Sequence, residues 1–329
     1  MSDTLRLRPA RVQPAWLWPG LVLIVFLLLA AAPLFANSYV VFILTMIAVN
    51  ALMALGFNFV IGFLGQLVFA NTAFFGIGAY AYAILIVHAG FPFPAALAGA
   101  CVIGALAGGL VGLPALRLRG FQLAIVTLAF NQLMQWVYLH SGWLGGGPSG
   151  LQLPDARFAG LEFTSDAAKY LLILIVTFVF IWLARNIARS TTGRAIVSVG
   201  ANEFAAAALS MPPVRVKITA FALSGLYSGL AGALFALLLG RVAPESFGLG
   251  ELLRGFAMVM VGGAGTVTGP VLGSIILTAA PEFLRNIPGA EELLYSFLLI
   301  ALLLFMPTGL FGGLCALFPG LRERHRGDG

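Results

Sequence analysis

The chain has 329 residues, of which 60% are hydrophobic and only 9% are charged. A mean hydropathy of +1.02 excludes an ordinary soluble domain, and no long polar stretch is left for a separate extramembrane domain. The two cysteines, Cys101 and Cys315, lie in apolar sequence and provide neither a disulfide framework nor a metal-site spacing. The composition therefore predicts an all-α, polytopic integral membrane protein with short loops.

Apolar runs of about 20 residues, long enough to cross the hydrocarbon core as helices, recur along the chain. The expected spans are 16–36, 39–61, 66–88, 94–116, 120–141, 168–185, 217–240, 252–281 and 293–311. Counting half-helices, we expect about 8–10 transmembrane helices in one domain over 16–318, between tails at 1–15 and 319–329. The stretch "PLFANS" loosely resembles a signal cleavage site, but the length of the first run favours a span.

The charges predict the topology. If both termini are cytoplasmic and each run crosses, the inner segments hold 13 of the 18 basic residues, and the outer segments hold most of the acidic ones. The main inner loop is then 186–216 and the main outer loop is 142–167. The basic pI reflects this orientation and argues against nucleic acid as a partner.

The run 252–281 must enter and leave on the outer side for this topology to hold. It contains "GGAGTVTGP" at 262–270, and glycines with a proline in mid-run are typical of a broken helix. We predict two half-helices, about 252–262 and 269–281, that fold back on each other. The alternative is one long span, followed by two short spans after residue 292.

No charged residue lies in the middle of an expected span. Proton-coupled carriers usually need an intramembrane carboxylate, histidine or lysine, and an intramembrane enzyme needs a polar or metal-binding cluster. The sequence has no G-x-x-x-x-G-K-[ST] motif, so ATP and its magnesium would have to bind to another subunit. We expect no catalytic residue, metal or cofactor in this chain; an ion-coupled secondary transporter of small polar solutes is the alternative function.

The stretch "GQLVFANTAFFGIGAY" at 65–80 places amides and glycines in an expected span. The polar side chains could bridge neighbouring helices, or the stretch could be a discontinuous helix that lines a translocation path. Because paired glycine-rich breaks point to a substrate region between repeats, we favour the path for the stretch as a whole. The expected lining residues are Gln66, Asn71, Thr72, Gly76, Gly78, Gly262, Gly263, Gly265, Thr266, Thr268 and Gly269.

Two further patterns concern packing and the inner loop. The series Gly104, Gly108, Gly112 and the series Gly225, Gly229, Ala233 recur at every fourth position and predict faces for close helix packing. In the inner loop, Asn202 can cap a short helix that Pro212 and Pro213 end, with Phe204, Ala208 and Met211 on one apolar face. That face would rest on lipid headgroups or contact another protein.

Six segments occur together in order: "AFFGIGAY" (73–80), "LRLRGFQLAIVTLAFNQLMQWV" (116–137), "GGGPSGL" (145–151), "GRAIVSVGANEFAAAALSM" (193–211), "KITAFALSGLYSGLAGAL" (217–234) and "VGGAGTVTGPVLGSIIL" (261–277). With them the chain resembles the LivM-type permease subunits of branched-chain amino-acid ABC importers. The resemblance covers roughly residues 40 to 310 and implies an importer permease fold with an internal repeat in the bacterial inner membrane.

The resemblance also implies partners: a homologous LivH-type permease, two ATP-binding subunits at the cytoplasmic face and a periplasmic substrate-binding protein. It implies that the inner loop couples to the ATPases through Gly193, Arg194, Glu203, Phe204, Ala205, Ala206, Ser210 and Met211. Ser210 stands where the family usually has glycine, and Ala70 and Asn71 stand where Gly-His is common. The resemblance therefore leaves the substrate open among branched-chain amino acids, other amino acids, urea and short amides.

Overall fold

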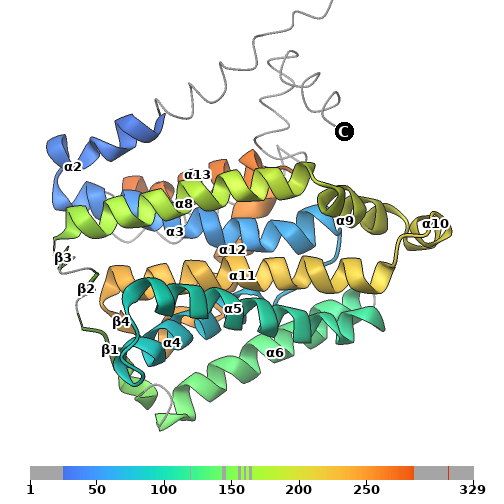
Figure 1. The fold of residues 1–329 in the computed structure, drawn as a ribbon, viewed down its shortest axis with the longest axis horizontal. Coiled ribbons are helices and arrows are strands. Elements are labelled where there is room, and N and C mark those ends of the chain that lie inside the picture. Colours follow the sequence, from blue (N-terminus) through green and yellow to red (C-terminus); the bar gives the residue numbers. More distant parts are fainter. Residues whose placement is uncertain are drawn as a thin grey trace, which may run out of the picture.

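The computed structural model describes residues 25–118, 120–142, 146–154, 157–158, 161–162, 165–284 and 310. Within these residues the fold is an array of helices along one long axis, with the short strands at one end and α9 and α10 at the other (Figure 1). Four of the described helices are long and apolar enough to cross a membrane, Ser38–Phe63, Phe93–Leu116, Asp166–Arg189 and Pro213–Leu239. The protein is therefore an all-α polytopic membrane protein, as predicted.

The helices follow most of the expected spans. They are α2 (Ala32–Phe35), α3 (Ser38–Asn58) with its π-helical extension η1 (Phe59–Phe63), α4 (Asn71–Val87), α5 (Phe93–Gly112) with the 3-10 turn η2 (Pro114–Leu116), α6 (Phe121–His140), α8 (Asp166–Arg189), α9 (Thr191–Ala201), α10 (Glu203–Ala208), α11 (Pro213–Leu239), α12 (Leu249–Gly262) and α13 (Thr268–Leu284). The first expected span lies partly outside the described residues, and the last lies outside them except for Leu310.

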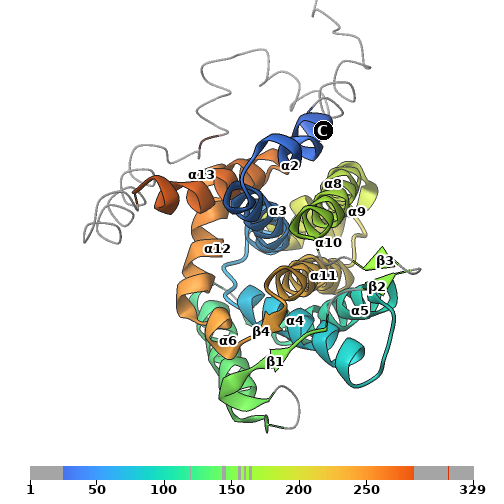
Figure 2. The same ribbon diagram turned by 90° about the vertical axis from the view of Figure 1, so that its left-hand side faces the viewer.

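The helix α11 lies at the centre of the fold and packs against α3, α4 and α5 (Figure 2). Glycines allow the backbones of α5 and α11 to touch, because a Cβ added at Gly104 would lie 2.5 Å from the carbonyl oxygen of Gly225. Gly108 likewise faces Phe221 and Gly225. The two predicted small-residue faces are therefore confirmed as packing faces, and they pack on each other.

The strands tie together two of the predicted outer segments. β1 (Leu151–Gln152) pairs antiparallel with β4 (Arg241–Val242), and β2 (Arg157–Phe158) pairs with β3 (Leu161–Glu162). The 3-10 turns η3 (Gly147–Ser149) and η4 (Pro244–Phe247) flank the first pair. Phe247 is buried against the rings of Tyr80 and Tyr138. Part of the expected loop 142–167 is thus anchored, through β1, to the strand that follows α11.

Two expected spans contain breaks. The expected start of the span 66–88 is wrong, because residues 64–70 are not helical and α4 begins only at Asn71. The run 252–281 forms two helices, so the alternative of one long span is wrong. Gly262 contacts Gly269, and Met258 contacts Gly273, so α12 and α13 run antiparallel away from their break. We call residues 64–70 the first break and 263–267 the second break.

Candidate functional site

The two breaks meet at a buried asparagine at the end of α3. The Asn58 side chain is fully buried; its Nδ2 donates to the carbonyl oxygen of Thr266 at 2.8 Å, and its Oδ1 accepts from the Gly265 N–H at 2.9 Å. One turn later, Gly62 approaches Gly265 so closely that a Cβ at Gly62 would collide with the Gly265 nitrogen. A single amide therefore satisfies two backbone groups of the second break and fixes it to α3.

The second break is also held by its own residues. Thr266 Oγ1 donates to the Gly263 carbonyl at 3.1 Å and accepts from the Gly269 N–H at 3.0 Å, so it caps α13. Gly263 and Gly265 have φ of 114° and 81°, which side chains other than glycine rarely adopt. The structure thus gathers the predicted residues of 262–269 in one turn. The Oγ1 of Thr268 is buried there and has no hydrogen-bond partner among the described residues.

The first break depends on neighbouring helices. The Phe69 N–H donates to Thr127 Oγ1 of α6 at 3.0 Å. Asn71 Nδ2 donates to Ser224 Oγ at 2.7 Å and to Ser228 Oγ at 3.1 Å, both on α11. Ser224 Oγ donates in turn to the Gly56 carbonyl of α3 at 2.7 Å. For Asn71 the helix-bridging interpretation is therefore correct: its amide joins the start of α4 to α11.

Of the other predicted path residues of this stretch, Thr72, Gly76 and Gly78 are buried by the chain itself, and Gln66 is half-buried. A Cβ at Gly76 would lie 2.6 Å from the Tyr138 ring, and Gly78 faces the backbone of Gly229. Both glycines therefore allow close packing. Three of the predicted path residues in this stretch have a buried atom without a hydrogen-bond partner among the described residues: Gln66 Oε1, Asn71 Oδ1 and Thr72 Oγ1. An apolar hollow of about 250 Å³ near this region contains none of the predicted path residues in its lining: Leu110, Val111, Pro114, Leu123, Val126, Thr127 and Phe130.

Sequence reasoning missed four polar residues that position the breaks, namely Asn58, Thr127, Ser224 and Ser228. Asn58, like Asn71, is an amide within an apolar run, and this pattern could have identified it in the sequence. Ser224 and Ser228 are one turn apart, next to the small residues of the α11 packing face. Their partners come from distant helices, so the sequence alone does not reveal the contacts.

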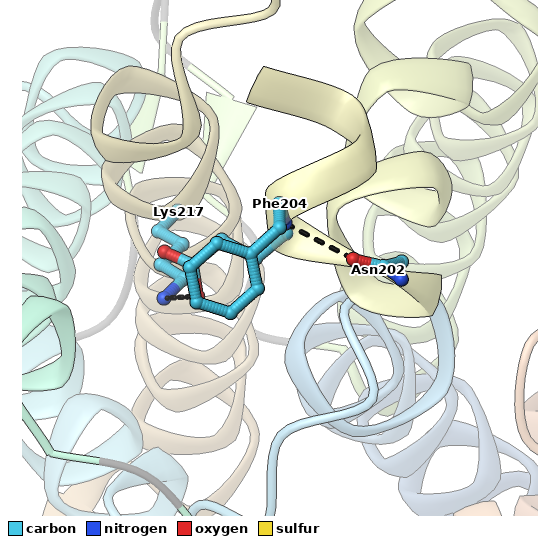
Figure 3. Close-up of polar contacts among 4 residues, drawn as sticks. Asn202, Phe204 and Lys217 are labelled. Carbon is cyan, nitrogen blue, oxygen red and sulfur yellow. Dashed lines mark hydrogen bonds and ion pairs between the residues drawn. The ribbon is translucent and has the colours of Figure 1, made fainter. Parts of the chain in front are cut away.

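The predicted inner loop, residues 186–216, is called the inner segment below. It contains the predicted helix cap. Asn202 Oδ1 accepts from the N–H groups of Phe204 and Ala205 at 3.0 and 3.1 Å, so it caps α10 as expected (Figure 3). Glu203 Oε2 lies 2.9 Å from Lys217 Nζ near the start of α11, and the Lys217 side chain is only 3% exposed. This ion pair, which the sequence analysis did not predict, attaches α10 to the central helix.

The prediction of an apolar face on α10 is correct only in part. Phe204 is 73% exposed and Ala208 is exposed, as predicted for an outward face, but α10 ends at Ala208. Met211 therefore lies beyond the helix, where it packs against a buried cluster that includes Ala206. The Ser210 N–H donates to Ala207 and the Met211 N–H to Ala206, while Ser210 has φ of 62°. This is the left-handed helix end that favours glycine, the residue usual in the family resembled.

The remaining predicted coupling residues lie at the α8–α9 corner. Gly193 is buried against the end of α8: a Cβ added there would lie 2.5 Å from the Ala188 carbonyl oxygen. Arg194 donates from its guanidinium to the Arg189 carbonyl at 2.8 Å. At its other end α9 contacts the first break: a Cβ at Gly200 would lie 2.6 Å from the Leu64 carbonyl oxygen. The inner segment is thus joined to the first break through α9 and to α11 through α10.

Comparison with known proteins identifies the family. The model of the family described as branched-chain amino acid transport system, permease component, matches residues 39–307. The chain belongs to this family. It is 33% identical to the high-affinity branched-chain amino acid transport system permease protein LivM of Escherichia coli K12, over 88% of this chain and 74% of that protein. LivM of Salmonella typhimurium is 32% identical over the same shares.

A more distant relative has another substrate in its name. The autoinducer 2 import system permease protein LsrC of Escherichia coli is 28% identical over 67% of this chain and 66% of that protein. No solved structure matches the chain. As a member of a permease family, with helices that can cross a membrane, this chain is the multi-pass permease component of a transport system.

Proposed function

We propose that the chain is the LivM-type permease subunit of an ATP-driven importer for branched-chain or related small amino acids, or amide-like solutes, in the bacterial inner membrane. The family and the two LivM relatives support the transport system and the substrate class. The observation that carries the mechanism is the double connection of the inner segment, through Gly200 to the first break and through Glu203 to α11.

In this proposal the end with α9 and α10 faces the cytoplasm. The described basic residues of the predicted inner segments lie on the elements of this end, Arg117, Arg185, Arg189, Arg194, Arg215 and Lys217. Two ATP-binding subunits dock against α10, where Phe204 and Leu209 are each 73% exposed. A homologous LivH-type permease pairs with this chain within the bilayer, and a periplasmic binding protein delivers the substrate at the opposite end.

The contacts suggest how a movement of the ATPases would reach the breaks. ATP binding shifts α10, and the Glu203–Lys217 pair makes α11 follow. Because Ser224 and Ser228 hold Asn71, the start of α4 moves with α11. ATP and the binding protein can bias the two states only through their different affinities for them. The chain itself carries out no covalent chemistry, since ATP and magnesium bind to the partner subunits.

The test is amino-acid uptake into proteoliposomes that contain all subunits, measured together with ATP hydrolysis. Glu203→Arg should sharply lower the uptake per ATP hydrolysed, because it places a second cation beside buried Lys217 and frees α10 from α11. Glu203→Gln keeps an acceptor for Lys217 and should retain most of the coupling. Normal coupling in Glu203→Arg would refute this role of α10. Uptake that an uncoupler abolishes while ATP is maintained would favour an ion-coupled transporter.

A further inference from the structure

The helix α6 lies at the edge of the fold (Figures 1 and 2). Its main contacts among the described elements are with α4, η3 and η4. Thr127 and Tyr138 face inward, since Thr127 binds the Phe69 N–H and the Tyr138 hydroxyl donates to the Ala73 carbonyl at 2.9 Å. The opposite side is exposed along the whole helix. We call it the α6 face; it consists of Gln122, Ile125, Val126, Ala129, Gln132, Leu133 and Trp136.

The α6 face differs chemically from the exposed faces of α5 and of the middle of α8. Between residues 171 and 183, the exposed residues of α8 are Leu171, Ile175, Val179, Trp182 and Leu183, all apolar. The exposed residues of α5 are Pro94, Ala95, Ala98, Val102, Ile103, Leu106 and Leu110, also all apolar. Faces of this kind suit lipid. The α6 face instead carries the amides of Gln122 and Gln132, and Gln132 lies near the middle of the 20-residue helix.

An amide in hydrocarbon costs free energy unless it finds a hydrogen-bond partner. The polar side chains of α6 have a visible consequence: α6 is as long as α5, yet it is not one of the four described helices apolar enough to cross a membrane alone. Gln135, by contrast, is half-buried and points to Gly248, whose added Cβ would lie 3.2 Å from its Nε2. The exposed Gln132 therefore indicates a neighbour other than lipid.

We propose that the α6 face is the surface on which the second permease subunit packs, with a polar group of that subunit opposite the Gln132 amide. The proposal rests on the proposed function, which supplies a second membrane subunit. Ala129 lies between the amides and allows a helix backbone to approach, while Leu133 and Trp136 supply apolar contact. An amide both donates and accepts, so a hydroxyl, an amide or an exposed carbonyl on the facing helix would serve.

The first test compares Ala129→Trp with Ala98→Trp in the co-expressed, full complex. Both alanines are exposed on helices of 20 residues, but Ala98 belongs to the apolar face of α5. At equal membrane levels, Ala129→Trp should reduce the co-purified second permease by about ten-fold, as overpacking of an interface would, and Ala98→Trp should leave it unchanged. Retention of the second permease by Ala129→Trp would overturn the proposal.

A second measurement does not depend on the fold tolerating a tryptophan. A photoreactive amino acid is placed at Leu133 on the α6 face or, as a control, at Leu106 on α5. An adduct between position 133 and the second permease supports the proposal. An adduct only with residues 293–311 of this chain, or no protein adduct at 133, overturns it. If the wild-type chain brings down no second permease, the proposed function fails as well, so the two failures are distinguishable.

Discussion

The second break and the first break lie close together, but different parts of the chain hold them. The second break takes its hydrogen bonds from Thr266, within the break itself, and from Asn58 beside it. The first break has local backbone bonds to Phe59 and Val60, but its side-chain bonds come from α6 and, through the adjacent Asn71, from α11, and it touches α9 at Leu64. The second break is therefore built as a fixed structural turn, whereas the shape of the first follows the positions of three helices.

This difference assigns separate roles to the two breaks. Changes at the second break should mainly lower stability, because its side-chain bonds come from its own Thr266 and from Asn58 of α3, and none of them joins it to α9, α10 or α11. Changes at the first break should lower the stability less than changes at the second break, and should lower the uptake per ATP hydrolysed more. The reason is that the contacts of the first break connect elements that move in the proposed cycle. Each of the following substitutions tests one side of that comparison.

The largest expected effect is that of Asn58→Leu. The substitution keeps the approximate volume but leaves the Gly265 N–H and the Thr266 carbonyl without the Asn58 amide, at a cost of about 3 kcal/mol in the free energy of unfolding. Asn50→Leu is the matched control, since Asn50 makes a single side-chain bond to Thr278 at 2.9 Å and should cost about 1 kcal/mol. Thermal unfolding of the detergent-solubilised complex measures both. Equal losses would show that Asn58 does not clamp the second break.

A pair of glycine substitutions compares the breaks directly. A Cβ at Gly262 would overlap the backbone of Gly269, so Gly262→Ala must push α12 and α13 apart, at a cost of about 2–3 kcal/mol. At Gly65 the nearest atom to an added Cβ is the Gly200 oxygen at 3.8 Å, and only the φ of 68° disfavours alanine, by about 1 kcal/mol. The same thermal assay ranks the two, and a larger loss for Gly65→Ala would reverse the comparison.

The second break could be placed from sequence to within a few residues, whereas the first was predicted only as a discontinuous helix somewhere within 65–80, and the reason is physical. Glycines at 262, 263, 265 and 269, followed by Pro270, mark a turn locally, and the structure has that turn within a few residues of the prediction. The first break has only Gly65 as a local signal, while distant side chains such as Thr127 and Ser224 stabilise its start and end. Helices extending from periodic apolar runs were therefore predictable, and contacts between distant helices were not.

The same limit applies to the coupling segment. The cap at Asn202 follows from local chemistry, so it was predicted correctly. The start of α11 was not: the helix begins at Pro213, four residues before the expected start of the span at 217. The partner of Glu203 is 14 positions away, across a chain reversal that a sequence pattern does not define. The internal repeat and the lining of the path stay predictions.

The smallest expected effect on stability is that of Asn71→Ala, at the start of α4 directly after the first break. The loss should be about 1 kcal/mol or less, because Ser224 keeps its bond to Gly56 and inter-helix hydrogen bonds in membrane proteins are modest. Coupling should suffer more, because α4 then lacks its polar link to α11 and follows it less closely. Uptake per ATP hydrolysed, measured beside the melting temperature, should therefore fall further in Asn71→Ala than in Asn50→Leu, which removes a similar bond outside the first break. If uptake per ATP falls equally in both variants, the first break has no special part in transmission.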